Sequence, residues 1–256
     1  PPLSTARRKP PRADTGYHSP ENGVNTDSGA ERCYPGSVVE SAAAQVPPLV
    51  AGKYRLHGAG TRDRFGVRHV PAEHTSIQRA VEVALLDASL PVDGPEARRL
   101  SAQALVLGRA RDLHLQGVMD SGNLPDGRPY VVFEALSGTT VPELLRETGG
   151  PLPPARAARL VLQVLEGLRA LHRAGVVVRG LTPESVVVTA RAGEEHVKLR
   201  DLQAAALLAD EGELPDVPFS PYVAPEIRRG GQGLDPGVDV YSAGALLGHL
   251  LTGAPA

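Results

Sequence analysis

The chain has 256 residues, and 41% of them are hydrophobic, so it is long enough to bury the core of one large domain or two small ones. Charged residues make up 22% and the formal net charge is -2. This balance excludes the basic surplus that nucleic-acid binding and anionic-membrane binding usually require, so we expect no nucleic-acid partner.

A single cysteine, Cys33, excludes an internal disulfide and the thiolate clusters of structural zinc and iron–sulfur sites. No apolar run approaches the ~20 residues that span a bilayer. We therefore expect a cytoplasmic protein with no membrane insertion within this chain. Any membrane tether is expected to lie in segments outside it. The 27 basic residues include just three lysines, which are Lys9, Lys53 and Lys198.

Residues 1–48 are rich in proline, serine, glycine and asparagine without apolar periodicity, which predicts a disordered tail or linker. The next part of the chain has five short β-type runs and one helix. An aspartate at position 93, as N-cap, with Pro95 and Glu96 in the first turn, predicts the start of that helix, which ends near Ala110. The expected strands cover residues 53–56, 65–70, 80–86, 117–120 and 130–133.

From residue 137 onward the pattern is mainly helical. Thr140 and Glu143 form a capping-box pattern for a short helix that ends at Gly149. Apolar residues at three- and four-residue spacing predict an amphipathic helix through residues 160–171, which ends at Gly175. Two short strands at 185–189 and 196–202 and a last helix at 238–251 complete this part.

Four sequence stretches follow one another in this helical part: GVVVRGLTPESVVVT at 175–189, VKLRDLQ at 197–203, APE at 224–226 and DVYSAG at 239–244. Their residues and spacing resemble the catalytic loop, magnesium loop, APE motif and central-helix motif of bacterial (Hanks-type) serine/threonine protein kinases. The resemblance covers residues 52–256. It implies an α+β, bilobal protein-kinase-like fold, with a five-stranded, one-helix N-lobe at 52–136 and a mainly helical C-lobe at 137–256. The C-lobe is expected to be truncated after its central helix.

The resemblance implies ATP and magnesium as cofactors, held by a third-strand lysine, its helix glutamate partner, and an aspartate and an asparagine on the metal. Aligning residues 81–87 with the third strand puts Ala84 at the lysine position, and a shift of two residues puts Glu82 there. Both registers remain open, and neither supplies a cation. The position of the glutamate partner is taken by Gln103, which cannot form the ion pair.

The catalytic loop has lost its chemical groups as well. Its histidine, base aspartate, phosphate-side lysine and metal-binding asparagine are replaced by Val178, Gly180, Thr182 and Ser185. Asp201 keeps the magnesium-loop aspartate, which predicts weak metal binding. Because loss of a general base alone typically costs ~10²–10⁴ in rate, we expect no catalytic residues and a pseudokinase-like member of the family.

The positions that support the fold in the family are retained. Val178 and Leu202 are apolar where the family packs a stack of side chains between the lobes, and Leu107 is expected to continue it. Asp239 matches the aspartate that braces the backbone of the catalytic loop. The chain is thus expected to keep the fold without the chemistry.

Nucleotide binding is a separate question. Gly58 and Gly60 keep the first two glycines of the phosphate loop without the third. The backbones of Glu134 and Leu136, in the hinge after the expected gatekeeper Phe133, could still bond adenine. Arg68 on the second strand is a candidate substitute for the lost lysine.

Three hypotheses follow. The first is a catalytically deficient pseudokinase that acts as a regulatory or protein-binding module. The second is an atypical active serine/threonine kinase that uses Asp201 and a displaced cation, and the third is a non-catalytic nucleotide sensor. Threonines in the tail indicate a protein partner with a phosphothreonine-reading domain as one class.

The eight histidines include no His-x-x-x-His pair, so the sequence does not predict a metal-hydrolase site.

Overall fold

A computed structural model describes residues 49–255, except 64, 203–205, 208–219 and 230–234. The expected tail at 1–48 lies outside the described residues. The chain divides into residues 1–43 and 44–256, and every described residue belongs to the second of these units. Within the described part, no helix is both long enough and apolar enough to cross a bilayer.

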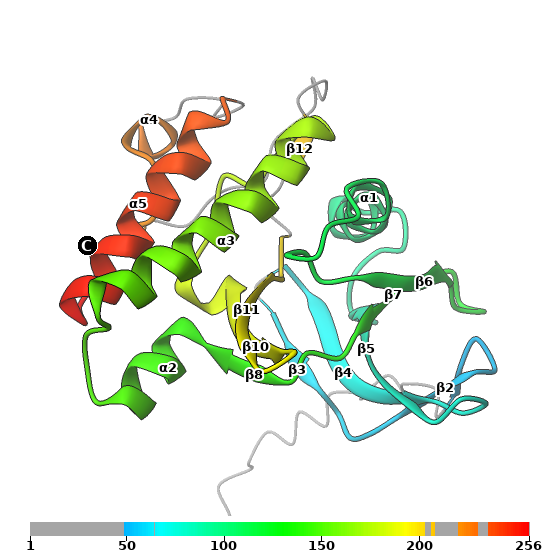
Figure 1. Ribbon diagram of the computed structural model, residues 1–256. Coiled ribbons are helices and arrows are strands. Elements are labelled where there is room, and N and C mark those ends of the chain that lie inside the picture. The colour runs from blue at the N-terminus through cyan, green and yellow to red at the C-terminus, as the bar shows by residue number, and fades with distance from the viewer. Residues whose placement is uncertain (1–48, 64, 203–205, 208–219, 230–234, 256) are drawn as a thin grey trace, which may run out of the picture. The chain divides into compact units, whose positions relative to one another are not determined.

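The first part of this unit is an antiparallel sheet with strand order β1-β2-β4-β5-β7-β6, in which the short β3 also pairs with β4 (Figure 1). Its strands are β1 (Leu49–Val50), β2 (Tyr54–Leu56), β3 (Thr61–Arg62), β4 (Val67–His74), β5 (Arg79–Leu86), β6 (Val118–Asn123) and β7 (Pro129–Glu134).

The five strands expected from the sequence correspond to β2, β4, β5, β6 and β7. The structure adds β1 and β3, each of two residues, which are too short to give a period-two alternation in the sequence. β4 begins two residues later than expected and continues to His74, because it pairs with β5 along its whole length from Val67 to His74.

Helix α1 (Pro95–Arg109) packs on this sheet through Ala97, Leu100, Ala104 and Leu107. Its N-cap is Gly94 rather than the expected Asp93, and no side chain caps the helix. The backbone at Gly94 explains why the helix starts there. Gly94 has the extended backbone of an N-cap, with φ -69° and ψ 172°, and its carbonyl accepts the amide hydrogen of Arg98, so the helix starts one residue later.

The second part contains α2 (Val141–Thr148), α3 (Pro154–Arg173), a 3₁₀ turn η1 (Pro183–Ser185), α4 (Pro225–Arg228) and α5 (Gly237–Thr252). The predicted capping box is present, since both the amide and the hydroxyl of Thr140 donate to Glu143 Oε2 at 2.7 Å. Helix α3 lies along α5 and also packs on strand β11 (Glu194–Leu199) (Figure 1).

Two small antiparallel sheets lie among these helices. One has the order β11-β10-β8, from β8 (Gly138–Thr140), β10 (Val186–Arg191) and β11 (Glu194–Leu199), and the other pairs β9 (Val176–Val177) with β12 (Ala206–Leu207). The strand expected at 196–202 ends at Leu199, because the Arg200 amide bonds the Ser185 carbonyl and Asp201 has a left-handed backbone with φ 53°. This early end places Asp201 in a loop.

One hydrophobic core continues from β4 and β5 through α1 to α3 and α5. Leu107, Val178 and Leu202, expected as a connecting stack, all belong to it and are buried. A second core covers residues of β2, β4 and β5 on the opposite face of the sheet. The α+β kinase-like architecture expected from the sequence is therefore confirmed.

Candidate functional site

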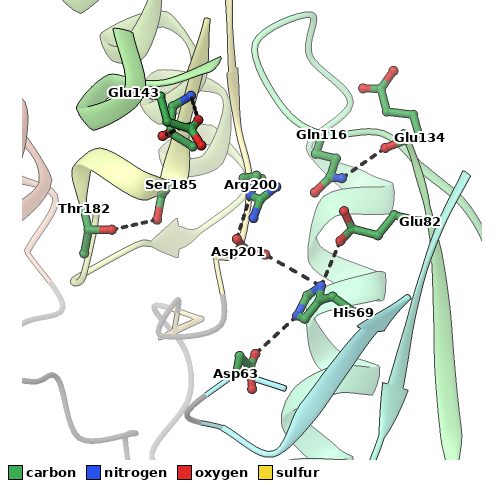
Figure 2. Close-up of polar contacts among 11 residues, drawn as sticks. Asp63, His69, Glu82, Gln116, Glu134, Glu143, Thr182, Ser185, Arg200 and Asp201 are labelled. Carbon is green, nitrogen blue, oxygen red and sulfur yellow. Dashed lines mark hydrogen bonds and ion pairs between the residues drawn. The ribbon is translucent and has the colours of Figure 1, made fainter. Parts of the chain in front are cut away.

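A cluster of charged side chains joins the large sheet to the loop after β11. His69 Nδ1 lies 2.8 Å from Glu82 Oε1 and 3.9 Å from Asp201 Oδ1. His69 Nε2 lies 3.3 Å from Asp63 Oδ2, and Arg200 Nε donates to Asp201 Oδ2 at 2.7 Å. Figure 2 shows the imidazole between the three carboxylates.

The strand register brings the first two residues together. β4 and β5 pair His69 with Ala84 and Pro71 with Glu82, so His69 and Glu82 are diagonal neighbours on one face of the sheet. Asp63 lies in the turn between β3 and β4, where its Oδ1 accepts the backbone amides of Phe65 and Val67 at 2.9 Å each. Its Oδ2 is thereby directed at the imidazole.

The charges in the cluster are coupled. Burial lowers the pKa of His69, but hydrogen bonds to Asp63 and Glu82 and the nearby charges of Asp201 and Glu82 outweigh it and raise the pKa to about 10. Burial raises the pKa of Glu82, yet the hydrogen bond and charge of His69, together with the charge of Arg200, hold that pKa below its ordinary value. His69 is therefore an imidazolium at neutral pH, paired with ionised carboxylates.

The residues matched to the lysine and its glutamate partner add no charge to this cluster, although Ala84 pairs directly with His69 across β4 and β5. Ala84 is fully buried in the core that contains α1. Gln103 is buried on α1, and among the described residues no donor reaches its Oε1. Glu82, also on β5, is hydrogen-bonded to His69, and His69 in turn lies near Asp201.

The catalytic-loop segment is held by a buried carboxylate on α5. Asp239 accepts the amides of Val178 at 2.9 Å and Arg179 at 2.8 Å, and its Oδ2 lies 2.7 Å from His172 Nε2. The bracing role expected for Asp239 is confirmed by these bonds. Gly180 follows in the same segment, its amide bonded to the Val178 carbonyl at 2.7 Å, and it offers no side chain to accept a proton.

Thr182 and Ser185 do not join the charged cluster. The Thr182 and Ser185 hydroxyls lie 3.3 Å apart, and the Ser185 side chain is buried. Figure 2 shows the two hydroxyls directed at each other, with Asp201 directed at His69 instead. The Ser185 hydroxyl is thus paired with Thr182, while the Ser185 carbonyl accepts the amide of Arg200, the residue before Asp201.

Of the two hinge positions, Glu134 makes hydrogen bonds within the chain. The Glu134 carbonyl accepts Gln116 Nε2 at 3.0 Å (Figure 2). The Glu134 carboxylate accepts the Gly117 amide at 2.8 Å and pairs with Lys198. Leu136 is half-buried in the short connection to β8. One of the two hinge positions expected to face adenine already carries an internal hydrogen bond at its carbonyl.

The two glycines of the expected phosphate loop have different surroundings. Both have a left-handed backbone, with φ 81° at Gly58 and 68° at Gly60. A Cβ at Gly58 would meet nothing within 4 Å, whereas a Cβ at Gly60 would overlap the carbonyl oxygen of His69. Gly60 is thus required by the close approach of the turn to β4, whether or not a nucleotide binds.

Arg68, the expected substitute cation, points elsewhere. Its Nη2 donates to Asp87 at 2.8 Å and its Nη1 to the Ala59 carbonyl at 3.2 Å. Neighbouring residues of a strand face opposite sides of the sheet. His69 therefore lies on the face toward Asp201, and Arg68 lies on the other face. Sequence reasoning missed His69, although alternation along β4 was a signal that could have separated the two.

Comparisons with known proteins give one family and several relatives. A protein-family model described as "Protein kinase domain" matches residues 114–256. Serine/threonine-protein kinase PknL of Mycobacterium bovis is 36% identical over 222 residues, which cover 84% of this chain and 51% of PknL. Serine/threonine-protein kinase PknD of Mycobacterium tuberculosis is 32% identical over 187 residues, covering 72% of the chain and 27% of PknD. The match to pkn3 of Myxococcus xanthus is 29% over 216 residues, covering 81% and 39%. The chain spans about half the length of PknL and less of the other two.

Proposed function

This chain belongs to the protein kinase family, with bacterial serine/threonine kinases as its relatives, and from that premise we propose that it is a catalytically deficient, pseudokinase-like member. Its proposed role is that of a regulatory or protein-binding module. The observation that carries the proposal is the surroundings of Asp201. This residue matches the family's magnesium-loop aspartate and lies against an ion pair of His69 and Glu82 rather than a lysine.

The cluster fits ATP and Mg²⁺ poorly. Kinases of the family place cations around the phosphates, because phosphoryl transfer depends on positioning and charge neutralisation. Among the described residues, three carboxylates face two cations, His69 and Arg200, so these five side chains together carry a net negative charge before any phosphate arrives. The Glu82 carboxylate would meet a triphosphate with repulsion. We derive no catalytic step through ATP.

The position of the general base supports the same proposal. Gly180 has no proton acceptor, and loss of a positioned base typically costs ~10²–10⁴ in rate. The hydroxyl of Ser185 is bonded to that of Thr182, and serine stands in place of the family's metal-binding asparagine, which supports a weakened second metal position. Base, metal and phosphate-binding roles are therefore affected together.

A second candidate function is an atypical active kinase. It is favoured by two cations beside Asp201, the imidazolium of His69 and the guanidinium of Arg200, which replace Arg68 in the hypothesis of a displaced cation. The third candidate is a nucleotide sensor that binds through the hinge without transfer, using the backbone of Leu136.

We propose a protein as the partner of this module, with a phosphothreonine-reading domain as one class. The support is the composition of residues 1–48, which contain several threonines and lie outside the described residues. The single cysteine supports a reducing, cytoplasmic compartment.

Thermal unfolding with and without ATP and Mg²⁺ tests nucleotide binding. A ligand present at 100 times its dissociation constant adds about 2.7 kcal/mol to the free energy of unfolding, which is a readily measured shift in Tm. At millimolar ATP and Mg²⁺ we expect no shift. A shift without phosphate transfer would replace the proposal with the sensor, and a shift with transfer would replace it with the active kinase.

A further inference from the structure

We propose that His69, Glu82 and Asp201 bind a divalent transition metal ion, with Zn²⁺ as the best match, between the large sheet and the loop after β11. The three residues come from β4, from β5 and from that loop. One ligand atom from each lies within 4.8 Å of the other two. This site uses the same three side chains on which the proposed function rests, but zinc binding is measured without ATP, so the two proposals can fail separately.

The distances suit a small tetrahedral ion. Zinc binds histidine nitrogen and carboxylate oxygen at about 2.0–2.1 Å, which sets two ligand atoms about 3.3 Å apart. His69 Nδ1 lies 2.8 Å from Glu82 Oε1 and 3.9 Å from Asp201 Oδ1, on either side of that value. Changes of about half an ångström would bring both of these distances to the value for two zinc ligands, and the two carboxylate oxygens lie within 4.8 Å of each other.

Asp63 provides the support that a ligating histidine requires. A metal-bound imidazole almost always donates its other ring N–H to a carboxylate or carbonyl, which fixes the tautomer and the ring orientation. Asp63 Oδ2 lies 3.3 Å from His69 Nε2, and its other oxygen is fixed by two backbone amides. The Nδ1 atom is thereby directed at Glu82 and Asp201, as Figure 2 shows.

The charge of the cluster matches a divalent ion. When a metal replaces the proton on Nδ1, the described side chains around it, three carboxylates and the Arg200 guanidinium, leave two negative charges. Arg200 binds Asp201 Oδ2, so Oδ1 is the oxygen left for the metal. An imidazole ligand favours zinc and its neighbours over magnesium, which prefers oxygen ligands.

Zinc titration of the full chain by isothermal calorimetry, after removal of metals with EDTA and dialysis, tests the site. We expect the protein to bind one Zn²⁺ more than the His69→Gln variant does. The matched control is His57→Gln, because His57 has an exposed side chain and lies outside the cluster. This control should bind as the unaltered protein does. Equal zinc affinity and stoichiometry of the unaltered protein and His69→Gln would overturn the proposal.

Asp63→Asn distinguishes a tuned site from chance proximity. An asparagine can keep the two backbone hydrogen bonds through its oxygen, while its amide N–H donates to Nε2 and moves the ring proton to Nδ1. We expect zinc affinity to fall about 10–100-fold, the usual cost of losing a supporting carboxylate. Unchanged affinity would contradict the assigned ligand atom.

Two further measurements keep the test decisive. Far-UV circular dichroism of each metal-free variant reports folding, and Asp201→Asn, in a half-exposed loop, replaces His69→Gln if the latter does not fold. Co²⁺ in place of zinc should give visible absorption bands of a low-coordinate site in the unaltered protein and not in the variant. Displacement of zinc by an equal concentration of Mg²⁺ would overturn the assignment to a transition metal.

Discussion

Asp239 is fully buried and accepts hydrogen bonds from the Val178 and Arg179 amides, and it also pairs with His172. Asp201, the aspartate matched to the magnesium loop, is half-exposed and faces His69. The two aspartates have opposite surroundings. One is a structural acceptor with every partner supplied by the chain, and the other is part of a charged cluster between two sheets.

Replacing Asp239 with alanine should be strongly destabilising. The change removes the acceptor of two buried amides and leaves His172 without its carboxylate, and breaking a buried pair in this way typically costs 3–5 kcal/mol, so we expect a loss of about that size. Urea unfolding measures it. Asp93→Ala, at an exposed position, is the control and should change the free energy of unfolding by less than about 0.5 kcal/mol. Similar losses in the two variants would contradict the bracing role.

His249 predicts a specific pH dependence. Its Nδ1 lies 2.7 Å from the Tyr222 hydroxyl, and burial lowers the pKa of His249, against a smaller opposing effect of the Glu184 charge. The unfolded chain therefore binds the His249 proton more tightly than the folded chain does. The contribution of His249 to the free energy of unfolding is fully present above about pH 6.5 and decreases as the pH falls below that value.

Urea unfolding between pH 5 and 8 compares the protein with His249→Gln, which cannot titrate. We expect the difference in unfolding free energy between the two to shrink as the pH falls. His57→Gln, at an exposed histidine, is the matched substitution for comparison. A difference that is constant across this range would show that His249 is not buried in its neutral form.

At the scale of elements, the turn between β2 and β3 determines how closely the chain approaches β4. Gly58 and Gly60 both have positive φ, but Gly60 also lies against the backbone of His69. The turn therefore supports the strand that carries the charged cluster.

The two glycines form a matched pair for mutation. Gly58→Ala should cost about 1–2 kcal/mol, the usual penalty of a left-handed backbone for an L-residue. Gly60→Ala should cost more, because its Cβ would also overlap the His69 carbonyl and force β3 away from β4. Thermal unfolding of both variants measures the difference. Equal losses would mean that the approach to His69 does not require glycine.

Periodicity in the sequence was sufficient to predict the long elements. Apolar spacing predicted α3, and apolar runs predicted β5 and α5, whereas the two-residue strands β1 and β3 gave no pattern. The His69–Glu82 neighbourhood depends on the register of β4 and β5. That register is set by a turn that includes Gln78 at φ 50°, an uncommon conformation for a non-glycine residue without a sequence signature.

The contact of His69 with Asp201 was still harder to predict. It joins two residues that are 132 positions apart in the sequence, and it depends on β11 ending at Leu199. The motif spacing identified Asp201, Gly180 and Ser185 as family positions but gave no information on which side chains of the sheet would face them. The candidate site therefore needed tertiary structure.

At the scale of the whole molecule, one core connects the sheet, α1 and the helices, and Asp239 braces the catalytic-loop segment. The retained features are those that hold a kinase fold together. The positions at which the proposal places a loss of chemistry are Ala84, Gly180 and Ser185. We infer that the fold serves binding or regulation and not phosphate transfer.

Transfer of labelled phosphate from ATP, with Mg²⁺ or Mn²⁺, tests this central claim most directly. The chain is incubated alone and with a generic acceptor protein, beside its Asp201→Ala variant. We predict no incorporation above that of the variant, into the chain or into the acceptor. Clear incorporation by the unaltered chain that Asp201→Ala abolishes would contradict the account and establish an active kinase.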